Sequence, residues 1–298
     1  MRPSGLPTSP DAQALFRAAT AQLTAAGVES SRLDARLLLE AAFGWKPYAL
    51  TLGTPAVTAE GLARFEGMLA RRLAREPVSR ILGLRDFWSL PFQISPATLD
   101  PRPDSECLVQ AVLDRVDRHK PLRLLDLGTG SGCLLIALLT ELPAAWGLGL
   151  DRAPDAAAMA QRNAETLGVG GRSAFAVGDW TEALAGRFDV ILSNPPYIPL
   201  ADRDSLAPEV RCFDPALALF GGADGLDPYR RFAAGLAGFL APGGLLALEI
   251  GWDQGAAVTA LLQQQGWRDV ACLPDLAGRD RVIVAYPPQT PRAVNGNP

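Results

Sequence analysis

The 298-residue sequence contains very little lysine and histidine. Only Lys46 and Lys120 among the 28 lysine and arginine residues are lysines, His119 is the only histidine, and the formal net charge is −4. Proteins that rely on non-specific attraction to nucleic acid carry an excess of positive charge, so the composition disfavours that class. His119 lies in the charged stretch DRVDRHK, which indicates a solvated surface residue rather than a catalytic base.

Cysteine is sparse and long apolar runs are missing. Cys107, Cys133, Cys212 and Cys272 are scattered without a CxxC pair, so neither a zinc site nor a disulfide framework is indicated, and we expect no metal. The longest apolar run, CLLIALL, is too short to cross a bilayer, and the N-terminus lacks the apolar core of a signal peptide. These absences predict a cytoplasmic protein with reduced cysteines and no membrane partner, while a mitochondrial location stays open.

The first part of the chain has helical periodicity. Residues 11–77 contain three amphipathic segments with apolar residues three or four positions apart. In the second segment Ser31 stands three residues before Asp34, which is a capping-box spacing. We predict a small helical-bundle domain over residues 1–79.

The pattern changes after this bundle. Residues 80–100 are rich in aromatic and β-branched residues and predict a β-hairpin or extended linker. The following DPRPDSE is too rich in proline for regular structure. From residue 121 onward short apolar runs alternate with helical stretches, which is typical of a doubly wound parallel sheet. The last two runs are joined by a short connection, so one strand is expected to be antiparallel. We assign residues 101–288 to this domain and 289–298 to a disordered tail.

A glycine-rich loop follows the first strand of the predicted sheet, in LLDLGTGSGCLL. Glycines permit a tight turn and a close approach of the backbone to a ligand. The loop lacks the lysine of a phosphate-binding P-loop, and a glycine-rich turn alone is a weak signal. Its residues are candidates for cofactor binding: Gly128, Thr129, Gly130, Ser131 and Gly132.

Acidic residues end three of the predicted strands. Asp126 ends the first, Asp151 ends the second, and Asp179 with Trp180 follows the third. A carboxylate at the position of Asp151 can accept hydrogen bonds from both ribose hydroxyls of an adenosine, and an acid beside an indole suits an adenine ring. Because ligands bind at the carboxyl ends of such strands, these residues predict an adenosine pocket that fits either NAD or S-adenosylmethionine.

Asn194-Pro195-Pro196-Tyr197 ends the fourth strand. This motif decides between NAD and S-adenosylmethionine as the predicted cofactor. Two prolines make a rigid corner that donates no hydrogen bonds. The side-chain oxygen of Asn194 and the carbonyl of Pro195 can accept hydrogen bonds from one planar NH₂ group, and Tyr197 can stack on a flat substrate. Such a clamp would favour a tetrahedral nitrogen whose lone pair faces a methyl donor, although a plain strand terminator is the alternative interpretation.

These residues resemble the class I S-adenosylmethionine-dependent methyltransferases. The resemblance implies that the glycine loop binds the methionine part of S-adenosylmethionine, Asp151 the ribose, and Trp180 the adenine neighbourhood. Asn194 is a further candidate contact to the cofactor. The corner Asn194-Pro195-Pro196-Tyr197 is the implied catalytic and substrate-binding motif, shared by enzymes that methylate adenine, cytosine or glutamine.

Longer segments resemble the release-factor glutamine N5-methyltransferases, the PrmC/HemK family. They are EPVSRILGLRDFWSLPFQISPATLDPRPDSECLV, FDPALALFGGADGLDPYR, LAPGGLLALEIGWDQG and DLAGRDRVI. The resemblance covers about residues 76–287 and implies a Rossmann-like domain with a mostly parallel seven-stranded sheet and one antiparallel strand, preceded by the helical bundle and the hairpin linker. Asp214 departs from the family pattern, where glutamate is expected, so the role of its loop stays open.

The implied substrate is the glutamine of the Gly-Gly-Gln motif in class I peptide chain release factors, which the helical domain would recognise. One alternative is an adenine N6-methyltransferase acting on DNA or RNA, which uses the same corner. The negative net charge weighs against this alternative, and we expect no direct nucleic-acid partner. A second alternative is a non-catalytic cofactor-binding protein. The intact glycine loop, Asp151 and the complete corner weigh against it.

Overall fold

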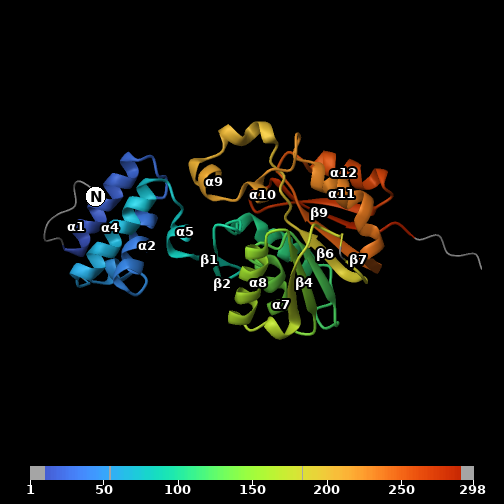
Figure 1. Cartoon of the computed structure of the whole chain (residues 1–298), viewed down its shortest axis with the longest axis horizontal. Helices are drawn as coiled ribbons and strands as arrows, with labels where there is room; N and C mark the ends of the chain where they lie inside the picture. The colour runs from blue at the N-terminus through green and yellow to red at the C-terminus, as the bar shows by residue number, and fades with distance from the viewer. Residues whose placement is uncertain (1–10, 54, 183, 290–298) are drawn as a thin grey trace, which may run out of the picture. The chain divides into compact units, whose positions relative to one another are not determined.

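The computed structural model describes residues 11–53, 55–182 and 184–289, and the chain divides into two compact units (Figure 1). The smaller unit comprises residues 1–84 together with 207–213, and the larger comprises 85–206 together with 214–298. The segment 207–213 was not anticipated in the smaller unit, because it is distant from the other residues of that unit in the sequence. Apart from Gln289, the predicted disordered tail lies outside the described residues.

The smaller unit is helical, as the periodicity predicts. Its core is formed by apolar side chains from five of its helices, and Leu15, Leu38 and Phe65 are completely buried. Thr58 caps one helix by accepting a hydrogen bond from the amide of Gly61. The helices are α1 (Ala12–Ala25), α2 (Ser31–Phe43), α3 (Ala49–Leu52), α4 (Ala59–Leu73), α5 (Val78–Leu82) and α9 (Pro208–Phe213).

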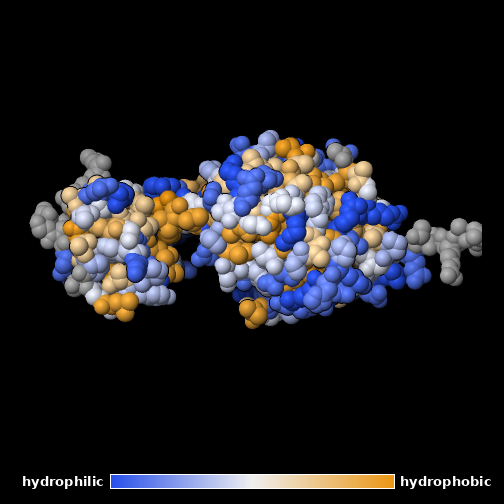
Figure 2. All heavy atoms as spheres, turned by 90° about the horizontal axis from the view of Figure 1, so that it is seen from below, coloured by the Kyte–Doolittle hydropathy of each residue, from blue (hydrophilic) through white to orange (hydrophobic). Residues whose placement is uncertain are grey.

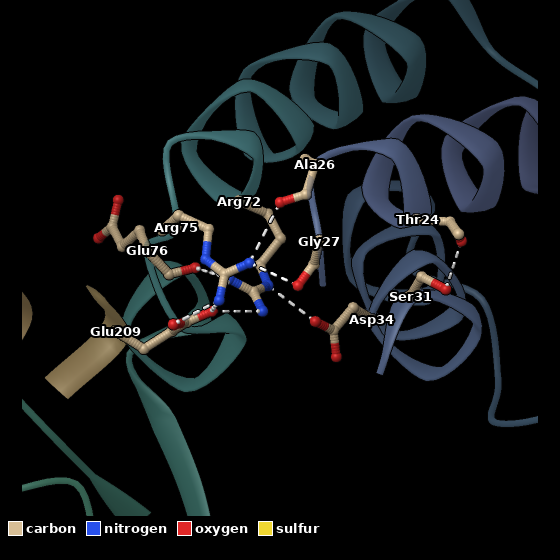
Figure 3. Close-up of polar contacts among 9 residues, drawn as sticks. All are labelled: Thr24, Ala26, Gly27, Ser31, Asp34, Arg72, Arg75, Glu76 and Glu209. Atoms are coloured by element: carbon tan, nitrogen blue, oxygen red, sulfur yellow. Dashed lines mark hydrogen bonds and ion pairs between the residues drawn. The ribbon is translucent and has the colours of Figure 1, made fainter. Parts of the chain in front are cut away.

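Helix α9 is held in this unit by an ionic network (Figure 3). Nε of Arg72 donates to Oδ2 of Asp34 at 2.7 Å, and Nη1 of Arg72 donates to Oε1 of Glu209 at 3.1 Å. Arg75 lies 2.8 Å from the same oxygen of Glu209. The predicted capping box at Asp34 is wrong, because the side chain of Asp34 is buried against Arg72 and the N-cap of α2 has no side-chain hydrogen bond.

The hairpin linker consists of β1 (Leu84–Phe87) and β2 (Leu90–Gln93). The turn residues Trp88 and Ser89 have φ values of 53° and 59°, as a two-residue turn of the primed type requires. The prediction of irregular structure over DPRPDSE is wrong at its end. A 3₁₀ helix, η1 (Pro103–Ser105), runs directly into α6 (Glu106–Leu113), because proline is tolerated in a first helical turn.

The larger unit contains a seven-stranded sheet in the order β5-β4-β3-β6-β7-β9-β8. Strand β9 runs in the direction opposite to the other six strands, and it lies between β7 and β8 rather than at an edge. This arrangement confirms the predicted Rossmann-like fold. The strands are β3 (Arg123–Leu127), β4 (Trp146–Asp151), β5 (Ser173–Val177), β6 (Phe188–Ser193), β7 (Leu240–Glu249), β8 (Arg268–Pro274) and β9 (Asp280–Tyr286).

Helices cover both faces of the sheet. One face packs against α6, α7 (Cys133–Glu141) and α8 (Pro154–Thr166), and the other against α11 (Asp227–Gly235) and α12 (Gly255–Gln264). The remaining short helices of this unit are η2 (Gly170–Arg172), η3 (Leu200–Ser205), α10 (Ala216–Leu219) and η4 (Leu236–Phe239). The chain reverses direction across the sheet between β3 and β6, where open α/β sheets bind ligands.

The molecular surface mixes apolar and charged side chains, and Figure 2 shows apolar patches between charged ones on one face of both units. Large exposed apolar side chains include Tyr48 and Leu52 in the smaller unit and Leu200, Leu217 and Trp252 in the larger one. Among the described residues, no helix has the length and apolar character needed to cross a membrane.

Candidate active site

A cavity of about 700 Å³ lies at the carboxyl ends of β3, β4, β5 and β6. This volume is within the range of about 300–1,000 Å³ that small-molecule sites occupy. The structure brings most of the predicted site residues to its wall, namely Gly128, Thr129, Gly130, Ser131, Asp151, Asp179, Trp180, Asn194 and Pro196. Four other predicted residues are not part of this lining: Asp126, Gly132, Pro195 and Tyr197.

The glycine loop crosses from β3 to α7 with its backbone facing the cavity. The amides of Gly128 and Thr129 both donate to the carbonyl of Leu150, at 2.8 and 2.9 Å, which fixes the loop against β4. Gly130 has a φ of 57°, and a side chain added there would meet no neighbouring atom within 4 Å. The open side of this loop therefore provides a cradle into which a ligand can approach the backbone.

Asp151 connects the loop to the next strand. Its Oδ2 accepts from the amide of Gly130 and its Oδ1 from the amide of Ala153, both at 2.8 Å. Each carboxylate oxygen keeps a further lone pair, so two hydroxyl donors can be accepted as well. Burial raises the pKa of Asp151 above its ordinary value, while the hydrogen bonds from Ala153 and Gly130 lower it.

Asp126 and Gly132 support the loop from behind. The Asp126 side chain is fully buried and accepts from Oγ1 of Thr129 at 2.7 Å, and burial raises the pKa of Asp126 to about 7. At Gly132 an added Cβ would lie 2.9 Å from Cδ1 of Ile136 and 3.0 Å from Cβ of Ala160. This glycine therefore permits close packing of α7 on α8, as the third glycine of a nucleotide-binding loop does.

Trp180 forms one side of the cavity. Its ring meets Phe232 edge-on, with centroids 4.8 Å apart, and a Cβ on Gly128 would lie 3.6 Å from the indole. Asp179 lines the cavity beside it and lies 3.7 Å from Arg231. An aromatic face and a carboxylate thus stand together after β5, as the sequence predicts for an adenine-binding neighbourhood.

The Asn194-Pro195-Pro196-Tyr197 corner leaves β6 at the cavity. Asn194 is half-buried, and its Nδ2 donates to Oγ of Ser105 at 3.2 Å. Nε2 of Gln254 donates to the Tyr197 carbonyl at 2.9 Å. The Tyr197 ring packs against the core beside α11, and burial raises its pKa to about 12. Stacking of Tyr197 on a substrate therefore stays a prediction.

Two glycines let another loop approach this corner closely. A Cβ at Gly221 would collide with the Pro196 carbonyl oxygen, and one at Gly225 would collide with the Tyr197 carbonyl oxygen. Directly after the corner, the amide of Ile198 donates to Leu219 and the amide of Gly221 donates to Ile198. These two hydrogen bonds join the beginning and the end of the segment 198–221. Within this segment, Leu200 and residues 215–218 line the cavity.

Sequence reasoning missed two polar residues of the site and left the role of a third, Asp214, open. Ser105 and Arg102 line the cavity, although the segment that contains them was predicted to be irregular. Nη2 of Arg102 donates to Oδ2 of Asp214 at 2.6 Å, and Asp214 is buried. The aspartate that departs from the expected pattern therefore still holds a cavity-lining arginine. The only signal in the sequence was the charge of Asp214 between Phe213 and Pro215.

Comparison with known proteins agrees with the fold. The family described as "Methyltransferase small domain" matches residues 87–207, and the one described as "PrmC N-terminal domain" matches residues 14–83. A methyltransferase structure from Pyrococcus furiosus, 16% identical, covers 75% of this chain and 99% of its own with a TM-score of 0.53, which shows the shared fold. The fold is that of a methyltransferase.

Curated relatives narrow the family further. The release factor glutamine methyltransferase of Rhodospirillum rubrum is 51% identical over 265 residues, which are 89% of this chain and 81% of the relative. The protein of the same name from Cereibacter sphaeroides is 48% identical and covers 92% of this chain and 97% of its own. This chain belongs to the family of release factor glutamine methyltransferases.

Proposed function

We propose that this protein transfers a methyl group from S-adenosylmethionine to the side-chain amide nitrogen of the glutamine in the Gly-Gly-Gln motif of class I peptide chain release factors. The observation that carries the proposal is that Asn194 and Pro196 line the same cavity as the glycine loop and Asp151. Family membership supplies the choice of release factor among the possible substrates.

The residues of the cavity fit the cofactor. The glycine loop offers open backbone, Asp151 offers two lone pairs, and Trp180 offers an aromatic wall. We assign the methionine part to the loop, the ribose to Asp151, and the adenine to Asp179 and Trp180. Bound there, S-adenosylmethionine supplies an electrophilic methyl group.

The Asn194-Pro195-Pro196-Tyr197 corner after β6 binds the substrate nitrogen that is methylated. The two N–H groups of the glutamine amide donate to the Asn194 side-chain oxygen and to the Pro195 carbonyl. These acceptors draw the nitrogen out of planarity, which frees its lone pair from the carbonyl. The nitrogen forms a bond to the methyl carbon, the bond from that carbon to sulfur breaks, and one amide proton leaves to water. Positioning of this kind can contribute about 7–11 kcal/mol to catalysis.

The experiment offers a tritiated methyl donor to the enzyme with a class I release factor, with duplex DNA and with RNA, side by side. We expect label in the release factor only, in the peptide that contains Gly-Gly-Gln, and none in a factor whose glutamine is replaced by alanine. Equal or greater labelling of adenine in DNA or RNA would replace the proposal with the nucleic-acid alternative. No labelling of any substrate by an enzyme that binds the cofactor would refute it.

A further inference from the structure

Glu249, the last residue of β7, is an unusual carboxylate in this fold. Glu249 is only 1% exposed, and no lysine or arginine among the described residues forms an ion pair with it. A buried carboxylate that forms no ion pair is costly to keep, even with the Arg281 charge nearby. Its position therefore calls for an explanation other than stability.

The parallel register of the sheet places Glu249 beside the catalytic corner. Ser193 pairs with Leu248, so the next residues along the two strands are Asn194 and Glu249. Burial raises the pKa of the Glu249 carboxyl group, and hydrogen bonding from the side chains of Ser105 and, more weakly, Asn194 lowers it. Oε2 of Glu249 has no hydrogen-bond partner in the part of the chain that the structure describes. Ser105 of η1, Asn194 directly after β6 and Glu249 of β7 thus form one small polar cluster.

In this cluster, Ser105 and Glu249 face Nδ2 of Asn194, the atom that carries the amide's N–H donors. An asparagine side chain has two N–H donors on Nδ2 and one acceptor oxygen. Nδ2 donates to Oγ of Ser105 at 3.2 Å, and a carboxylate can only accept, so the second N–H faces Glu249. No group within the described residues donates to Oδ1 of Asn194. With both donors held behind it, the amide is left with a free acceptor at a residue that lines the cavity.

We infer that Glu249, with Ser105, is a positioning residue that fixes the Asn194 amide so that its oxygen accepts a hydrogen bond from the substrate amide. The inference rests on the proposed function, and it adds a residue that does not touch the substrate. A flipped amide would set its oxygen against the carboxylate, so the ionised Glu249 excludes that orientation. A charge-assisted N–H···O bond also polarises the amide and makes its oxygen a better acceptor.

The same arrangement predicts a dependence on pH. Burial, as the largest cause, raises the pKa of Glu249 to about 7. Once protonated, Glu249 can donate to Oδ1 of Asn194 and compete with the substrate. Arg281 and Asp104 are the charged groups beside it, while burial keeps the neighbouring tyrosines and thiols neutral by raising their pKa values. The titratable and charged groups around Glu249 are Asp104, Cys107, Cys133, Tyr197, Tyr229 and Arg281.

The first test measures single-turnover methylation of a release factor at saturating cofactor and factor, from pH 6 to pH 9. The wild-type rate is expected to rise with an apparent pKa near that of Glu249. In Glu249→Gln the rise should vanish and the plateau should fall about 10- to 100-fold, the range found for orienting partners. Ser105→Ala, which keeps the carboxylate, should fall less and keep the rise. A Glu249→Gln enzyme with the wild-type rate and pH profile would overturn the inference.

The second test needs neither cofactor nor substrate, so it separates this inference from the proposed function. The ¹⁵N-labelled protein shows the Asn194 side-chain NH₂ resonances, identified by their loss in Asn194→Ala. They should move with pH around 7 in the wild type and stay still in Glu249→Gln. Asp126→Asn removes another buried carboxyl whose pKa is raised to about 7, and it should leave the movement intact. If the Asn194 resonances of the wild type do not change with pH, the contact between Asn194 and Glu249 is contradicted, whatever substrate the enzyme methylates.

Discussion

At the scale of single residues, Asp151 shows how one side chain organises a binding site. Its two oxygens already accept from the amides of Gly130 and Ala153, so the carboxylate shapes the loop and presents its remaining lone pairs to the cavity. Replacement by alanine therefore removes both a loop contact and an acceptor for the ribose.

We expect Asp151→Ala to weaken S-adenosylmethionine binding at least tenfold, since each hydrogen bond to a charged group is worth roughly 1.5–3 kcal/mol. Titration calorimetry measures the effect. The control is Asp155→Ala, an exposed carboxylate in the first turn of α8, which should bind as the wild type does. An unchanged dissociation constant for Asp151→Ala would remove this residue from the site.

The second prediction at the scale of single residues concerns Asn194 and the rate of methyl transfer. Its oxygen is assigned to a hydrogen bond that strengthens as the substrate nitrogen leaves planarity, and such interactions show in the chemical step. Asn194→Ala should slow single-turnover methylation on the order of 10²–10³, as loss of a comparable preorganised contact does. Binding of the release factor should change little. A wild-type single-turnover rate in this variant would reduce the corner to a structural turn.

The residues that were predictable share a local signal. Gly128, Gly130, Asp151 and Asn194 each stand at the end of an apolar strand, so sequence order alone places them on one edge of a parallel sheet. Ser105 and Glu249 carry no such signal. Their relation to Asn194 depends on the register of β6 against β7 and on the path of a proline-rich segment, and neither follows from periodicity.

At the scale of elements, α9 is short and polar, and its place in the smaller unit depends on Glu209. The Arg72 side chain is 6% exposed and that of Asp34 is 8% exposed, so this ion pair is buried, whereas Glu209 is partly exposed. Removing Asp34 leaves the buried Arg72 guanidinium with the partly exposed Glu209, and full loss of a partner in a buried pair costs about 3–5 kcal/mol, which sets an upper limit.

Asp34→Ala should therefore destabilise the helical unit by up to about 3–5 kcal/mol, and by more than the loss of an exposed ion pair does. Hydrogen exchange followed by mass spectrometry measures this directly as lost protection in peptides from α2 and α4. Glu60→Gln breaks an exposed pair with Arg64 on α4 and should cost less than about 1 kcal/mol. Equal protection in both variants would mean that the buried pair contributes nothing beyond a surface pair.

The elements themselves were largely predictable, because strands and helices of the sheet domain have clear apolar patterns. The exceptions have physical causes. The capping-box spacing at Asp34 was misleading because a buried arginine competes for the same carboxylate. Helix α9 owes its place to Arg72 and Arg75, which are remote in sequence, so no local pattern could assign it to the smaller unit.

At the scale of the whole molecule, cofactor binding and substrate recognition are assigned to different parts of the chain. Every residue that lines the cavity lies between Ala97 and Arg231, and none belongs to the smaller unit. A protein without residues 1–76 should therefore bind S-adenosylmethionine with nearly wild-type affinity but methylate an intact release factor poorly. Calorimetry and the methylation assay measure the two properties. Full-rate methylation by the folded, truncated protein would refute the recognition role of the helices.

Because α9 belongs to the smaller unit, the order of synthesis on the ribosome acquires a meaning. The first helices emerge long before Glu209, so Arg72 and Arg75 must wait for their carboxylate until most of the sheet domain has been made. The N-terminal helices should then become fully resistant to protease only in nascent chains stalled beyond residue 213, and not in those stalled just after residue 120. The smaller unit therefore cannot be completed before most of the larger unit has been synthesised.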